Sequence, residues 1–82
     1  MGDNDDATSV HDLDVTLWVG KAGIDPAIEE LATQLEHTGR VKVRVLRPAR
    51  AHDSVEEIAE QLAESTNARV IDVRGHTAVI GR

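Results

Sequence analysis

One glycine-rich segment, Gly20-Lys21-Ala22-Gly23, has residue types that could bind a phosphate group. It stands between an apolar run that ends at Val19 and a predicted helix start at Asp25-Pro26. Glycines let the backbone take positive φ and come close to a ligand, and the lysine adds a mobile positive charge. The unpaired N–H groups of a helix N-terminus also favour anions. KH-type modules clamp nucleotide backbone with a G-x-x-G loop, so the segment predicts contact with RNA, although this spacing alone often makes only a turn.

The elements that must position this loop begin with a strand and a helix. Weak alternation predicts a strand over 14–19, and apolar residues at spacings of three and four predict a helix over 26–38. Asp25 is the predicted N-cap, Pro26 fits the first helical position, and Gly39 is the predicted C-terminal cap. The loop is therefore expected to join the end of a strand to the start of a helix.

Four further elements follow in the second half of the chain. Clean alternation predicts a strand over 40–47 with a basic outer face, followed by a loop over 48–53. Ser54 and Glu57 form a capping box that starts a second helix over 54–66. Two strands over 68–73 and 76–80 are joined at Arg74-Gly75, which is a hairpin signal.

The element order β-α-β-α-β-β favours a single compact α+β domain over residues 14–82. Each helix has one apolar stripe, so the two can cover one face of a four-stranded mixed sheet. A right-handed crossover is expected between the first two strands, and the last two strands must be antiparallel. Residues 1–13 carry four of the five aspartates of the first 14 residues and no lysine or arginine. They predict a disordered acidic tail, with an autoinhibitory arm that mimics phosphate as the alternative.

Charge is divided between the helices and the strands. The net charge is -6, but all 9 lysines and arginines lie outside the predicted helices, which carry glutamates instead. A basic strand side on an acidic protein favours a ligand that bears phosphate, whereas the bland interpretation is that exposed strands simply need polar residues. The basic residues taken as candidate RNA contacts are Lys21, Lys42, Arg44, Arg47, Arg50, Arg74 and Arg82.

The aromatic content limits how bases could be recognised. Trp18 is the only aromatic residue of the chain, so stacking of bases on several rings is excluded. Trp18 is instead predicted to lie in the core or half in it, with a stacking platform for a base as the alternative. RNA would then be held mainly through phosphate, sugar and shape.

Enzyme, metal and membrane classes receive little support from the sequence. There is no cysteine, the four histidines are scattered, and adjacent Glu29 and Glu30 do not share a helix face, so no catalytic residue, metal site or cofactor is expected. No apolar stretch approaches the roughly 20 residues of a membrane span, and the acidic N-terminus is unlike a signal peptide, which predicts a cytoplasmic location. Two lysines against seven arginines, without Phe or Tyr, suggest an archaeal protein adapted to high salt.

The segment from Val15 to Arg82 resembles a CRM domain (chloroplast RNA splicing and ribosome maturation), the family typified by the bacterial ribosome-associated protein YhbY. Three stretches carry the resemblance: LWVGKAGI at 17–24, RVKVRVL at 40–46 and VRGHTAVIGR at 73–82. The resemblance implies a fold like the C-terminal domain of bacterial translation initiation factor 3, and RNA binding without catalysis. Bacterial members associate with precursors of the large ribosomal subunit, and plant members act in the splicing of organellar introns.

The family's motifs fall on particular residues of this chain. The resemblance places the G-x-x-G loop on Gly20–Gly23, the basic strand on Lys42 and Arg44, and a hairpin position that is often lysine on His76. Two departures stand out. The family usually begins with a basic helix, for which residues 1–13 are too short and too acidic, and His76 carries less positive charge at neutral pH than lysine would.

These observations lead to one expected function and two alternatives. We expect a monomeric protein that binds structured RNA in large-subunit assembly or RNA maturation, with ribosomal proteins as further partners. A chromatin protein of the archaeal Alba type shares the element order but is usually more basic. A protein-interaction module could instead dock a basic ribosomal protein on the acidic helix faces.

Overall fold

A computed structural model of the chain describes residues 13–82. Apart from Leu13, the predicted acidic tail over 1–13 lies outside the described residues. The elements are β1 (Val15–Val19), α2 (Asp25–Thr38), β2 (Arg40–Val45), the 3-10 helix η1 (Arg47–Ala51), α3 (Val55–Ser65), β3 (Arg69–Arg74) and β4 (Thr77–Gly81). The predicted β-α-β-α-β-β order is confirmed, with η1 as an addition.

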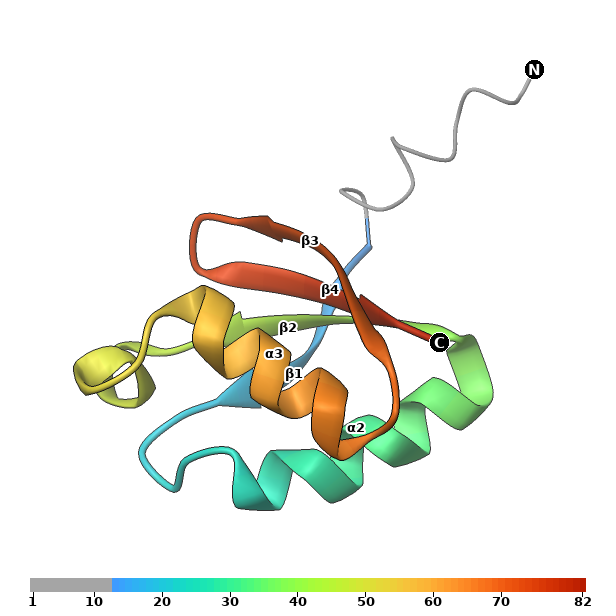
Figure 1. Cartoon of the computed structure of the whole chain (residues 1–82), viewed down its shortest axis with the longest axis horizontal. Coiled ribbons are helices and arrows are strands. Elements are labelled where there is room, and N and C mark those ends of the chain that lie inside the picture. Colours follow the sequence, from blue (N-terminus) through green and yellow to red (C-terminus); the bar gives the residue numbers. More distant parts are fainter. Residues whose placement is uncertain (1–12) are drawn as a thin grey trace.

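The strands form one mixed sheet in the order β1-β2-β4-β3 (Figure 1). β1 runs parallel to β2, with Leu17 opposite Val43, and β4 is antiparallel to both β2 and β3. This arrangement brings the carboxyl ends of β1, β2 and β3 to the same end of the sheet as the start of β4. The G-x-x-G loop leaves β1 at that end, which is named the loop end below.

Both helices pack on one face of the sheet. Buried Leu31 of α2 and Leu62 of α3 belong to the same core cluster as Val41 and Val43 of β2. The strand alternation therefore turns Lys42 and Arg44 to the opposite face, on which no described helix packs (Figure 1). Because Leu31 and Leu62 are completely buried, replacing either by alanine should cost about 2–5 kcal/mol of folding stability.

The start of α2 differs from the expectation. The predicted N-cap at Asp25 is wrong, because the helix is capped by Ile24 without a side-chain hydrogen bond. The carbonyl oxygen of Ile24 accepts from the N–H groups of Ala27 and Ile28 at 2.9 and 3.0 Å. Asp25 is thus already inside the first turn, next to Pro26.

The other helix ends agree with the sequence. Gly39 ends α2 in the left-handed region with φ 78°, and its N–H donates to the carbonyl of Leu35. The capping box of α3 is confirmed: the N–H of Glu57 donates to Ser54 Oγ at 3.1 Å, and the N–H of Ser54 to Glu57 Oε1 at 2.9 Å. No helix within residues 13–82 is long and apolar enough to cross a membrane.

The segment between β2 and α3 is more ordered than expected. The strand predicted to run to Arg47 ends at Val45, and the predicted loop over 48–53 is largely the 3-10 helix η1. The N–H of Ala49 donates to the carbonyl of Leu46 at 3.0 Å, and Pro48 fits the first turn because its ring fixes φ and no donor is needed there. A short ordered helix therefore holds Arg47 and Arg50 close to the end of β2.

Candidate nucleic-acid interface

The G-x-x-G loop is a tight turn with exposed central side chains. The N–H of Gly23 donates to the carbonyl of Gly20 at 2.9 Å, and Gly23 has φ 84°, which L-amino acids rarely adopt. Lys21 and Ala22 are exposed at the tip. Asp25, in the first turn of α2, places a negative charge where the helix N-terminus would attract an anion. The loop itself and Lys21, rather than the helix dipole, are therefore the groups suited to hold phosphate.

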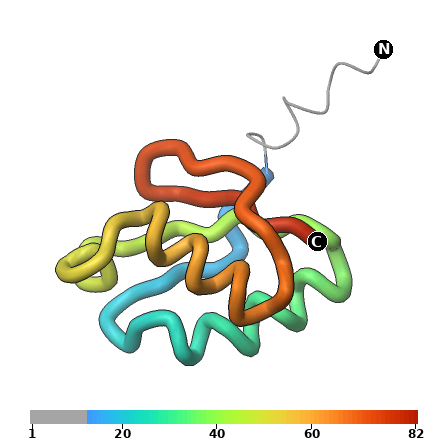
Figure 2. The backbone as a smooth tube through the Cα atoms, viewed as in Figure 1, coloured from blue at the N-terminus to red at the C-terminus, as the bar shows by residue number. Residues whose placement is uncertain are grey.

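Two backbone hydrogen bonds bring other segments beside this loop. The N–H of Leu46 donates to the carbonyl of Val19 at 2.8 Å, and the N–H of Val45 donates to the carbonyl of His76 at 2.8 Å. The first bond places the start of η1 beside the loop, and the second attaches the β3–β4 turn to the end of β2. The backbone trace shows these segments gathered at one end of the molecule (Figure 2).

The arginines at the loop end have different surroundings. Arg47 is exposed in η1, whereas Arg50 is half-buried and its Nε donates to the carbonyl of Val45 at 3.2 Å. On the open face of the sheet, Arg44 and Arg74 both lie opposite Thr77 in register. At the loop end, the G-x-x-G loop, the arginines of η1 and the pair Arg44 and Arg74 on the strands therefore lie together and form one basic surface.

Not every predicted contact residue lies at this end. Lys42 is half-buried in the middle of β2, opposite Val79. Arg82 follows β4 at the far end of the sheet, where its N–H donates to the carbonyl of Gly39 at 3.2 Å. The structure therefore does not bring Arg82 together with the loop, which the sequence alone could not show.

His76 lies in the β3–β4 turn, where it is exposed beside the end of β2. Gly75 precedes it with φ 60°, while His76 itself does not have positive φ, a combination typical of a type II′ hairpin turn. The Oγ1 of Thr77 donates to the carbonyl of Arg74 at 2.8 Å and closes the turn further. The side chain of His76 is thereby presented at the loop end, as the resemblance implied.

A pocket of about 210 Å³ lies behind the loop, bounded by Lys21, η1 and the start of α3. Half-buried Asp53 lines it together with His52 and Gln61. The negative carboxylate of Asp53 would repel a phosphate group placed in this pocket. The outer side of the loop is consequently the better position for RNA backbone.

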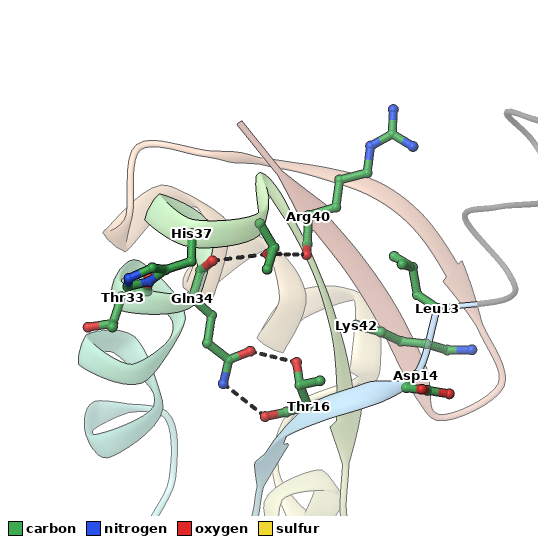
Figure 3. Close-up of a pocket in the computed structure, with 9 residues that line it drawn as sticks. Leu13, Asp14, Thr16, Thr33, Gln34, His37, Arg40 and Lys42 are labelled. Atoms are coloured by element: carbon green, nitrogen blue, oxygen red, sulfur yellow. Dashed lines mark hydrogen bonds between the residues drawn. The ribbon is translucent and has the colours of Figure 1, made fainter.

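A second pocket, of about 380 Å³, lies at the far end between β1, α2 and the start of β2 (Figure 3). Gln34 of α2 donates through Nε2 to the carbonyl of Thr16 at 2.9 Å and accepts from the Thr16 hydroxyl. Nδ1 of His37 lies 2.9 Å from the carbonyl of Thr33. These polar groups bond to one another within the protein, and the bonds between Gln34 and Thr16 hold α2 against β1. The pocket is also remote from the G-x-x-G loop.

Trp18 was predicted to lie in the core or half in it, and this prediction is wrong. Its side chain is 54% exposed, because the alternation of β1 turns Leu17 and Val19 to the helices and Trp18 to the open face. It lies opposite Arg44 in the parallel register. The signal was present in the sequence: a five-residue strand that buries Leu17 and Val19 must expose the residue between them.

Most of the described acidic residues lie on the helix side of the molecule. The exposed glutamates of the two helices are Glu29, Glu30, Glu36, Glu56, Glu57, Glu60 and Glu64. Among residues 13–82, no group of three or more His, Asp or Glu side chains could hold a metal ion. The helix side is thus acidic, whereas the open sheet face carries Lys42, Arg44 and Arg74 together with Asp72, which lies opposite Val79 as Lys42 does.

Comparisons with known proteins identify a family and two similar proteins. The model of the CRS1/YhbY (CRM) domain matches residues 7–82. A protein from Methanocaldococcus jannaschii, named as a probable RNA-binding protein, is 39% identical over 72 residues, which is 88% of this chain and 54% of the relative. The chain thus spans about half the length of that curated relative. The solution structure of a hypothetical protein from Staphylococcus aureus, described as a candidate RNA-binding protein, is 31% identical with a TM-score of 0.74, covering 93% of this chain and 78% of the other.

Proposed function

The chain belongs to the CRS1/YhbY (CRM) domain family, and we propose that it is a non-catalytic protein that holds RNA backbone at the loop end of its sheet. The names of both relatives support RNA as the ligand class. The observation that carries the proposal is the junction of the G-x-x-G loop, η1 and the β3–β4 turn by the hydrogen bonds of Val45 and Leu46. Three segments distant in sequence thereby present cations and backbone N–H groups to one ligand.

The residues at this end have complementary tasks in the proposal. The small side chains of the loop allow a close approach of RNA backbone to its N–H groups, and Lys21 adds a charge at the tip. Arg47 and Arg44 extend the contact along η1 and the open sheet face, where guanidinium groups suit phosphate oxygens. Phosphate and sugar contacts fix the orientation of an RNA without defining its sequence.

Salt concentration limits how such a surface can bind. Each phosphate contact with a cation releases counterions, so affinity for single-stranded RNA falls with a slope of about -0.7 per contact in log salt. A protein that works in concentrated salt cannot depend on this term. Backbone N–H contacts in the loop and a shape fit to structured RNA are therefore the parts of the interface expected to persist.

We propose a precursor of the large ribosomal subunit as the RNA, in agreement with the resemblance described above. A monomeric state and a cytoplasmic location belong to the same proposal. Ribosomal proteins are proposed as further partners, because the exposed glutamates of α2 and α3 form an acidic side opposite the basic one. This acidic side also supports a second candidate function, a docking module for basic proteins that does not require RNA.

The direct test is fluorescence anisotropy with labelled hairpins from large-subunit RNA, and with DNA duplexes of matched sequence, at moderate and high potassium chloride. Saturable binding to the RNA hairpins that persists in part at high salt is the expected result. Equal binding to DNA duplex would favour the Alba-like function. Absence of binding to either nucleic acid by protein with folded circular dichroism would leave the docking module as the better account.

A further inference from the structure

The open sheet face carries an exposed apolar pair next to the G-x-x-G loop. Trp18 is 54% exposed and Leu46 is 37% exposed, and they are the exposed large hydrophobic residues of the described chain. A lone exposed apolar residue needs no explanation, but an indole beside an arginine and a phosphate-binding loop does. The exposure of Trp18 and Leu46 therefore calls for a ligand that covers them.

Trp18 and Leu46 lie on the same face with a glycine between them. Trp18 lies opposite Arg44 in register, and Leu46 comes two residues after Arg44 along extended backbone, so Trp18 and Leu46 share the open face. A Cβ added at Gly20 would meet Leu46 Cδ1 at 3.5 Å, which places the leucine side chain over that glycine. Trp18, Gly20 and Leu46 form one shallow surface, here named the apolar platform.

Positive charge lies beside the apolar platform. Arg44 lies opposite Trp18 in register on the same face, and Arg47 and Lys21 are the next residues in the chain after Leu46 and Gly20. A flat apolar surface with a cation beside it is complementary to a nucleotide, which has an aromatic base and a negative phosphate. We propose that RNA held by the loop continues onto this face and stacks one unpaired base on the indole of Trp18. The inference rests on the proposed function and deepens it, because it makes an unpaired nucleotide part of the recognised RNA.

The alternative occupants fit less well. A stable protein interface buries about 800 Å² on each partner and has few charges at its centre, whereas this platform is one tryptophan and one leucine with Arg44 beside them. A second copy of the chain bound through a two-fold axis would bring Arg44 and Arg47 of both copies together. Like charges would oppose that dimer, so a base is the occupant that the surroundings favour.

Because Trp18 is the only aromatic residue, intrinsic fluorescence reports on this position alone. The experiment uses two RNA hairpins that differ by a single unpaired nucleotide, each with a dye at the end remote from the bulge. Dye anisotropy measures binding, and quenching of Trp18 emission measures stacking. The expected result is binding of both hairpins with strong quenching by the bulged one only.

The outcomes separate this inference from the proposed function. Binding of both hairpins without quenching overturns the stacking of a base on Trp18 and leaves the function intact. Absence of any anisotropy change overturns the function and the inference together. A Trp18 emission that depends on protein concentration without RNA shows a dimer on this face, and it too overturns the inference.

Variants at Trp18 supply a second measurement by dye anisotropy. Trp18→Leu keeps an apolar side chain but removes the aromatic face, so affinity for the bulged hairpin should fall about 5- to 100-fold. Trp18→Phe should recover part of that loss, and affinity for the paired hairpin should not change in either variant. Equal losses for both hairpins would contradict base stacking, since a merely structural change would weaken both.

Discussion

The backbone N–H of Val45 donates a hydrogen bond to the carbonyl oxygen of His76, 2.8 Å away. The next residue, Leu46, donates to Val19 on the opposite side at the same distance. Consecutive residues of an extended chain point their N–H groups in opposite directions, so the end of β2 holds the β3–β4 turn on one side and the approach to the G-x-x-G loop on the other. The basic surface is therefore assembled by main-chain bonds, which substitutions of its side chains leave in place.

The first prediction concerns the tip of the loop. Replacing Lys21 and Ala22 together by aspartate should abolish RNA binding without unfolding the protein. Both side chains are exposed, and the turn is closed by the backbone bond between Gly23 and Gly20. Two carboxylates at that position would repel the phosphates that the loop is proposed to hold. RNA anisotropy and the urea midpoint are the two measurements.

A matched control exists at the far end of the sheet. Arg69→Asp with Thr33→Asp makes the same change in net charge, -3, at two exposed positions of β3 and α2. This control should retain most of the RNA affinity, whereas the loop variant should not. Equal losses in both variants would mean that net charge, and not the loop, governs binding.

The second prediction separates the roles of the two loop glycines. Gly23→Ala puts a side chain on a backbone with φ 84° and should cost about 1–2 kcal/mol of stability. Gly20→Ala meets only an ordinary contact with Leu46 at 3.5 Å, so its stability should change little. Its RNA affinity should nevertheless fall, because the added methyl group lies beside Leu46 on the apolar platform, over which RNA is proposed to pass. Full affinity in Gly20→Ala would show that RNA does not approach this glycine.

The third prediction distinguishes the arginines of η1. Arg47→Gln should make the slope of log RNA affinity against log salt concentration shallower by about 0.7, because one phosphate contact is lost. Folding stability should not change, because Arg47 is exposed. Arg50→Gln should instead lower stability by about 1 kcal/mol, since it removes the bond from Nε to the carbonyl of Val45. Salt titrations of RNA affinity and urea unfolding test the pair. An unchanged slope in Arg47→Gln would remove Arg47 from the contact surface.

The fourth prediction concerns stability alone. Ser54→Ala removes half of the capping box that begins α3 and should cost about 0.5–2 kcal/mol in urea unfolding. The hydroxyl serves the helix and not the loop, so RNA affinity measured below the transition should be unchanged. Ser54→Asp is the control, because a carboxylate can also accept the N–H of Glu57. No difference in stability between the alanine and aspartate variants would contradict the capping role.

The parts of the fold that the sequence predicts are those set by local rules. Ser54 with Glu57 and the left-handed Gly39 mark helix ends through contacts within a few residues. The alternation of β2 shows which side chains are buried. The element order and the single helix-covered face of the mixed sheet also follow from these local patterns.

The incorrect predictions depended on choices that local patterns leave open. Trp18 is large and apolar, but the strand has only one buried face, already occupied by Leu17 and Val19. Asp25 can cap a helix, but the backbone of Ile24 is already helical, with φ -85° and ψ -21°, so the helix begins one residue earlier. Likewise, Arg82 is distant from the loop because of the order and direction of the strands, and the pattern of charges along the sequence does not reveal that order.

The central claim, that RNA binds at the loop end of the sheet, is tested most directly by an NMR titration of ¹⁵N-labelled protein with a large-subunit RNA hairpin. The account predicts shifts of backbone amides at 20–23, 44–47, 49–50 and 74–77, with little change at 29–38 or 56–65 and none with matched DNA duplex. Shifts confined to the acidic helices, or centred on the far end around Arg40, Arg69 and Arg82, would contradict it.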